Sequence, residues 1–194
     1  MLHSNTERLI DYWRTRKFDR LSPSRSAIDP TEFTELLPQI FMLGRAGPGQ
    51  HLFRLTGELV SSLHGRDLRR TDFLDLWSPT DRPRLAAALE TSRRTAEPVM
   101  ATAEGRTSRG DTVRLELMLA PLRADVAPID RFLGLYQPLS NLEVLRDRPV
   151  VELGLVRLAA HGERPAAPTL RLAAIDGRLV GPARSHVAIL EPRA

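Results

Sequence analysis

The chain has 194 residues, of which 42% are apolar and 27% charged, and it contains no cysteine. This length allows one domain with extensions, and it is sufficient to bury a core. The lack of cysteine excludes disulfide scaffolds, thiolate zinc sites, cysteine nucleophiles and a cysteine-linked flavin. The formal net charge is +4, and arginines alternate with acidic residues along the chain, which argues against nucleic-acid binding.

The sequence gives no sign of a membrane segment. No apolar run approaches the roughly 18 residues of a membrane span. The first residues include Asn5, Glu7 and Arg8 and therefore lack the apolar region of a signal peptide. We expect a cytoplasmic protein.

Residues 4–16 are predicted to form an amphipathic helix. Ser4 and Glu7 have the spacing of a capping box. Apolar side chains then recur at helical intervals, at Leu9, Ile10, Tyr12 and Trp13. This stripe must pack either on the chain's own core or on the same helix of a second chain. For the second case, a homodimer, we expect the interface to contain Leu9, Tyr12 and Trp13.

A short helix and a β-hairpin are predicted next. Asp29 and Pro30 are typical of an N-cap and a first helical position, and Pro38 ends the helix. The apolar runs 39–43 and 51–55 then flank a glycine-rich stretch, which is the pattern of strand, turn and strand.

Helical pieces follow the hairpin. The spacing of apolar residues predicts short helices within 58–76, with Gly65 as a stop signal, and a longer helix over 79–94. Alternating or apolar runs over 99–104, 113–119 and 131–137 predict three more strands. The resulting α+β arrangement is a five-stranded antiparallel sheet with helices on one face. The other face is expected to be partly exposed or covered by the N-terminal helix.

Several ordered motifs resemble one known family. These motifs are Asp11-Tyr12-Trp13, Pro23-Ser24-Arg25, Leu36-Leu37-Pro38, Phe53-Arg54-Leu55-Thr56-Gly57 and Gly65-Arg66-Asp67-Leu68, with an aromatic-rich segment that ends at Trp77. In this order they are similar to a bacterial, mainly alphaproteobacterial, family of single-domain PAS proteins, the PAS_5 type, over about residues 5–140. The PAS fold that the resemblance implies has the same five-stranded sheet and short-helix crossover.

The resemblance divides the chain into three parts. Residues 1–20 hold the N-terminal amphipathic helix, and residues 21–140 form the PAS-like domain. Residues 141–194 form a C-terminal extension, either as short strands or partly disordered; Asp176-Gly177 in it has the pattern of a hairpin turn. The implied function is a non-enzymatic sensory or protein-interaction module in bacterial signalling.

Two arginines are candidate ligand contacts. Arg66 follows Gly65 and could hold a carboxylate or phosphate through its guanidinium fork. The structural alternative is that Asp67 caps the next short helix while Arg66 pairs with an acid. Arg54 alternates with Phe53 and Leu55 along its strand, which favours the solvent side for Arg54.

A cavity between the sheet and the crossover helices is the other candidate site. The strand from Val99 presents small side chains inward, opposite Leu115, and a small ligand could fill the remaining space. Phe73 and Trp77 would line it. In the alternative, Phe73, Trp77 and Leu89 fill it themselves, as native packing density favours.

The histidines and motifs argue against cofactors and catalysis. Haem-binding PAS domains carry a histidine on the longer crossover helix, which has none here, so His64 is left as the possible ligand. No metal-binding histidine spacing, nucleophile elbow, dinucleotide fingerprint or P-loop occurs. Three functions remain: a small-molecule sensor, an adaptor with a filled core that acts by contact with a signalling protein, and an enzyme for an anionic substrate held by Arg66.

Overall fold

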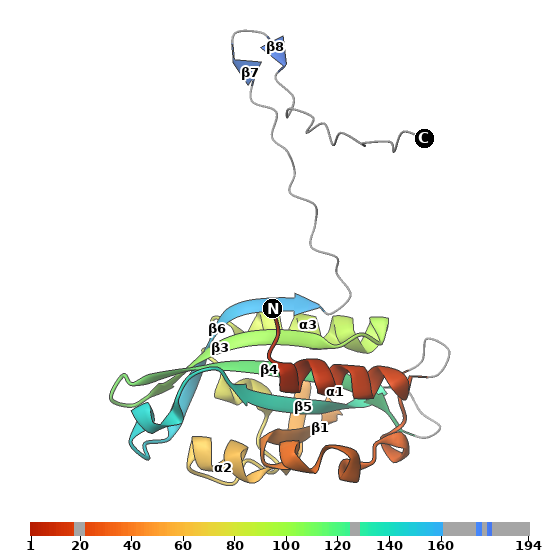
Figure 1. Cartoon of the computed structure of the whole chain (residues 1–194), viewed down its shortest axis with the longest axis horizontal. Helices are drawn as coiled ribbons and strands as arrows, with labels where there is room; N and C mark the ends of the chain where they lie inside the picture. Colours follow the sequence, from red (N-terminus) through yellow and green to blue (C-terminus); the bar gives the residue numbers. More distant parts are fainter. Residues whose placement is uncertain (18–21, 125–128, 161–173, 176–177, 180–194) are drawn as a thin grey trace, which may run out of the picture. The chain divides into compact units, whose positions relative to one another are not determined.

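The computed structural model describes residues 1–17, 22–124, 129–160, 174–175 and 178–179. Its main element is an antiparallel sheet with the strand order β2-β1-β5-β4-β3-β6 (Figure 1). The strands are β1 (Ile40–Gly47), β2 (Gln50–Thr56), β3 (Val99–Thr107), β4 (Thr112–Arg123), β5 (Ile129–Pro138) and β6 (Val150–Ala160). The first five are the strands that the sequence predicts, and their order confirms the PAS-like α+β fold.

Helical segments connect and cover the strands. They are α1 (Ser4–Thr15), η1 (Arg25–Ala27), η2 (Pro30–Gln39), α2 (Glu58–His64), η3 (Phe73–Leu76), α3 (Arg82–Thr95) and η4 (Leu142–Leu145), where η marks a 3-10 helix. The predicted caps of the short segments are present, since Asp29 accepts from the Thr31 amide and Gly65 ends α2 with a φ of 60°. In the described part of the chain, no helix is long and apolar enough to span a membrane.

The longer crossover helix starts later than the sequence predicts. We expected it to begin at Pro79, but α3 begins at Arg82 with Asp81 as its N-cap residue. The reason is local, because the Ser78 hydroxyl donates to the Asp81 carboxylate at 2.7 Å and closes a turn before the helix. Asp81 is thereby held beside strand β6.

The sheet has one strand more than the sequence predicts. β6 pairs with β3 from Thr107 opposite Val150 to Val99 opposite Ala160. The sheet therefore extends beyond residue 140, where we expected the domain to end. Short strands were expected in this region, and an apolar strand beside the open edge of β3 buries more surface than one left alone.

A second, two-stranded sheet is formed by residues later in the chain. β7 (Ala174–Ile175) pairs antiparallel with β8 (Arg178–Leu179). The Asp176-Gly177 turn predicted between them lies outside the described residues.

Each face of the sheet carries its own core. The inner core lies between the sheet and the segments α2, η3 and α3, and includes Phe41, Phe53, Phe73, Trp77, Leu117 and Tyr136. The outer core lies between the sheet and the segments α1 and η2, and includes Leu9, Ile10, Trp13, Phe33, Met118 and Leu133. Figure 1 shows α1 lying across β4 and β5.

The N-terminal helix therefore packs on its own chain, the first of the two predicted arrangements. Leu9 and Trp13 are 0% exposed in the outer core, so they present no surface to a second chain as the expected dimer interface requires. Tyr12 is half-buried, and its hydroxyl accepts from the Asp29 amide at 2.7 Å, which ties α1 to the start of η2. The stripe that suggested a dimer is instead used to cover the sheet.

Trp13 also makes a hydrogen bond that the strand needs. Its indole Nε1 donates to the Pro121 carbonyl at 2.9 Å. Pro121 lies in β4 beyond the end of β3, because β3 begins at Val99 opposite Leu119. A proline has no amide hydrogen to offer a neighbouring strand, and its carbonyl would remain buried without a donor. The indole supplies that donor.

The Trp13→Ala variant should lose about 3–5 kcal/mol of unfolding free energy, because it leaves a large void and an unpaired Pro121 carbonyl. Trp13→Phe keeps most of the apolar volume and should lose clearly less. Urea unfolding followed by circular dichroism measures both. An alanine variant that keeps wild-type stability but lowers the mass measured by light scattering would restore the helix as a dimer interface.

Candidate functional site

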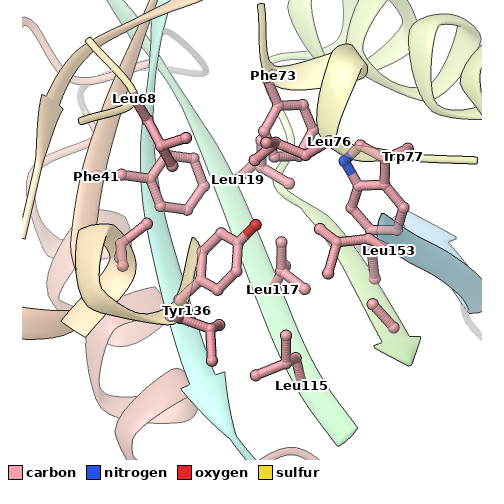
Figure 2. Packing of buried hydrophobic residues seen from close by; sticks show 14 of the residues in the cluster. Phe41, Leu68, Phe73, Leu76, Trp77, Leu115, Leu117, Leu119, Tyr136 and Leu153 are labelled. Carbon is pink, nitrogen blue, oxygen red and sulfur yellow. The ribbon is translucent and has the colours of Figure 1, made fainter. Parts of the chain in front are cut away.

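Five aromatic side chains meet in the inner core, the region where a ligand cavity was considered. Phe41 stacks on Phe73 at 5.9 Å between ring centroids and meets Tyr136 edge-on at 5.4 Å. Phe53 lies 5.5 Å from Phe41, and Trp77 lies 5.7 Å from Phe73. All five are 0–1% exposed. Figure 2 shows four of these rings packed among leucines of the sheet and the crossover.

A glycine in the neighbouring strand makes this packing possible. Gly134 of β5 lies directly opposite Phe41 of β1. A Cβ at residue 134 would overlap the Phe41 ring. The ring therefore occupies the space that a side chain on β5 would otherwise take, and this brings Phe41 into contact with Tyr136.

One hydrogen-bonded chain crosses the inner core. His64, at the end of α2, has Nδ1 3.0 Å from the Val150 carbonyl of β6 and Nε2 3.3 Å from the Tyr136 hydroxyl. A carbonyl only accepts, so Nδ1 carries the proton and Nε2 accepts from the tyrosine. This chain joins the crossover to β5 and β6, and it requires a neutral imidazole.

Burial keeps both groups of this pair uncharged. Desolvation lowers the pKa of His64 to about 4, with Arg66 adding to the effect, while the bond to the Val150 carbonyl opposes it. Desolvation also raises the pKa of the Tyr136 hydroxyl well above its ordinary value. Neither group exchanges a proton near pH 7.

Among the described residues whose buried polar atoms lack a hydrogen-bond partner, Trp77 lies in the inner core and His51 contacts Phe132 of that core. The Trp77 indole Nε1 has no acceptor, and neither ring nitrogen of His51 has a hydrogen-bond partner. His51 is 2% exposed on β2 and meets Phe132 edge-on at 5.6 Å. Desolvation lowers the pKa of His51, which a nearby Asp72 partly offsets. Unpaired groups of this kind each cost about 1–3 kcal/mol.

The structure brings together four of the six predicted ligand contacts. His64, Phe73, Trp77 and Leu115 are all buried in the inner core or at its edge. Leu89, which was expected to help fill the space, is buried there as well.

The two arginines lie elsewhere. Arg54 and Arg66 are both exposed, so neither reaches the inner core. Asp67 accepts from the Arg69 amide at 2.9 Å, as a capping residue would, and its carboxylate pairs with Arg69 rather than with Arg66. Within the described residues, no group of histidine and acidic side chains could hold a metal ion.

Sequence reasoning missed Tyr136 and His51 as members of this site. Tyr136 lies in a strand where most residues are apolar, and nothing in its spacing distinguishes it from a core residue. His51 begins an apolar run and could equally have faced solvent. Only the pairing register places both side chains inside.

The stability of the fold should depend on pH through His64. Its pKa is about 4 when folded, against about 6.5 in an unfolded chain, so the unfolded state binds more protons between these values. The stabilisation is complete above pH 6.5 and is lost as pH falls toward 4, by about 3 kcal/mol in total. Urea unfolding at pH 7.5 and pH 5 measures this loss.

The His64→Gln variant should flatten this slope, because glutamine does not titrate. His51→Gln is the matched control and should remove a smaller part of it. If His64→Gln keeps the wild-type slope between pH 7.5 and 5, His64 is not the titrating group.

Comparisons with known proteins give a family match and several distant structural matches. A model of the PAS domain family matches residues 1–137. A search of curated proteins finds no match. Among solved structures, a light-oxygen-voltage domain studied with a flavin analogue has a TM-score of 0.46 and 13% identity, covering 60% of this chain and 87% of its own. A light-oxygen-voltage protein of Rhodobacter sphaeroides has a TM-score of 0.45 and 12% sequence identity, and the match covers 61% of this chain and 72% of that protein. Because the sequence identities and TM-scores are this low, we infer no response to light and no flavin binding from these matches.

Proposed function

The chain belongs to the PAS domain family, and on that premise we propose that it is an interaction module that acts in bacterial signalling by contact with a partner protein. The observation that carries the proposal is the filled inner core. Phe41, Phe53, Phe73, Trp77 and Tyr136 are fully buried and in mutual contact. A ligand between sheet and crossover would have to displace several of these rings, each of which contributes about 1.5–3 kcal/mol by its burial.

Strand β6 is hydrogen-bonded to three segments of the crossover. The Val150 carbonyl accepts from His64 of α2, and the Leu153 carbonyl accepts from the Ser78 amide at 2.9 Å, next to η3. The Leu155 amide donates to the Asp81 carboxylate at the start of α3 at 2.9 Å. Three crossover segments are thus tied to one strand, and a partner that shifts any of them would strain β6.

The proposed module is non-enzymatic. General acid–base catalysis near neutral pH works best with a group whose pKa lies near 7. Burial instead lowers the pKa of His64 to about 4 and raises the pKa of Tyr136 well above the ordinary tyrosine value. Arg66, the proposed anchor of the enzyme for an anionic substrate, is exposed and lies outside the inner core.

A small-molecule sensor is the second candidate, and the unpartnered polar groups favour it. Trp77 Nε1 offers a donor inside the inner core, and the two nitrogens of His51 offer a donor and an acceptor. A ligand that satisfied these groups would recover their desolvation cost. A ligand of Trp77 would have to accept from an indole, and a ligand of His51 would have to bond an imidazole.

The partner of the proposed module is either a second copy or another signalling protein. A homodimer would have to use a surface other than Leu9 and Trp13, because both are fully buried. Light scattering on the purified full chain separates these cases, since a dimer doubles the measured mass.

Native mass spectrometry of the purified full chain should give the mass of the polypeptide alone, because the interior is occupied by its own side chains. A bound small molecule that is released on denaturation and lost in the Trp77→Phe variant would contradict the filled-core proposal. That result would establish the sensor instead, since the variant removes only the indole donor and part of the ring.

Asp81→Ala should weaken the attachment of β6 to the crossover. Loss of a charge-assisted bond of about 1.5–3 kcal/mol predicts at least tenfold faster hydrogen exchange at the Leu155 amide. Asp75→Ala is the matched control, because its exposed carboxylate pairs with Arg82 and does not contact β6. Equal exchange in both variants would contradict this role of Asp81.

A further inference from the structure

Two adjoining hollows lie at the outer edge of β2, outside the inner core. One has a volume of about 510 Å³ and the other about 560 Å³. Arg54, Asp67 and Arg69 line both of them. Arg70 completes the first hollow, whereas Thr56 and Ser61 line the second. The rim is therefore rich in guanidinium groups.

A β-bulge presents Arg54 to this surface. In the β1–β2 ladder, Met42 lies opposite Leu55 and Leu43 lies opposite Phe53, which leaves Arg54 as the extra residue. Bulges of this kind redirect a side chain out of the regular alternation. The Arg54 side chain passes over Gly44 of β1, where a Cβ would overlap its Nε atom. The bulge at Arg54 and the lack of a side chain at Gly44 together make room for the Arg54 side chain.

Arg70 reaches the same surface through an uncommon backbone conformation. Its φ is 68°, in the left-handed region that arginine seldom adopts. Two backbone bonds to β2 hold it there: the Arg70 amide donates to the Phe53 carbonyl at 2.9 Å, and the Phe53 amide donates to the Thr71 carbonyl at 3.0 Å. The loop is thereby fixed beside the strand that carries Arg54.

The charges of the hollow do not cancel. Asp67 is occupied by Arg69, whose Nε lies 2.8 Å from one carboxylate oxygen and 3.1 Å from the other. Among the described residues, the side chains of Arg54 and Arg70 make no hydrogen bond or ion pair. Two positive charges therefore face the hollow unpaired.

We propose that the first of the two hollows, which both arginines line, binds a phosphate monoester between Arg54 and Arg70. Each guanidinium offers paired N–H donors in a planar fork, and two forks suit a tetrahedral group with three terminal oxygens better than a carboxylate with two. A phosphate monoester carries a charge of about −1.5 to −2 at pH 7, which matches the two unpaired arginines. The hydroxyls of Thr56 and Ser61, which lie 3.0 Å apart, line the adjoining hollow.

The phosphate can come from a free metabolite or from a phosphorylated side chain, and both present the same chemistry. The site is separate from the inner core, so it stands or fails independently of the proposed function. If the ligand is a phosphorylated side chain, the partner of the proposed module is a phosphorylated protein.

The experiment is a titration of the ¹⁵N-labelled full chain at constant ionic strength, followed by amide shifts of residues 54–56 and 67–70. One arm uses inorganic phosphate and the other uses N-acetyl-phosphoserine amide. The test variant is Arg54→Gln combined with Arg70→Asn, because asparagine tolerates a positive φ. Arg94→Gln combined with Arg109→Gln removes two exposed arginines elsewhere and is the matched control.

We expect saturable shifts confined to these residues, at least tenfold weaker affinity in the test variant and less than a twofold change in the control. Equal affinity for the two anions would identify a free phosphate as the source, and tighter binding of the phosphoserine would identify a side chain. Shifts that do not saturate, or an equal loss in the control, would overturn the proposal. Wild-type shifts outside the hollow verify that each variant is folded.

Discussion

The central strand β4 is buried on both of its faces, and the remaining layers follow from that constraint. Every residue from Leu115 to Leu122 is buried. A sheet with helices on one side only would leave Met118 and its neighbours in water. α1 and η2 must therefore cover the outer face, while α2, η3 and α3 cover the inner one. The N-terminal helix is an integral layer of the domain and not an appendage.

Burial of the outer face creates polar requirements that the first residues satisfy. Glu116 of β4 and Gln137 of β5 lie opposite one another, 5% and 6% exposed. The His3 amide donates to the Glu116 carboxylate at 3.0 Å, and the Asn5 side chain donates to Gln137 at 2.9 Å. Together with the indole bond of Trp13, these contacts fix where α1 lies along the strands.

Local chemistry explains what could be predicted. Turn residues, prolines and apolar spacing act within a few positions of the chain, so the helical segments, the hairpin and the succession of five strands along the chain could be predicted from the sequence. The docking of α1 could not, because its apolar stripe fits a sheet and a second helix equally well. For β6, short strands were expected in the C-terminal extension, but its partner β3 lies about 50 residues earlier in the chain, beyond the reach of local signals.

The same distinction applies to the candidate sites. Phe73, Trp77 and Leu115 could be placed in the core from apolar spacing alone, whereas the roles of Tyr136 and His51 depend on register across strands. The meeting of Arg54 with Arg70 depends on a bulge and a left-handed residue, neither of which has a signature at those positions.

Phe41 and Gly134 share one volume across two strands, so the two positions cannot be substituted independently. A relative with a side chain at the position of Gly134 could not keep a ring at the position of Phe41. It would need a smaller residue there, and the space vacated by the ring would open the inner core. A side chain at residue 134 is therefore compatible with this fold only together with a smaller residue at position 41.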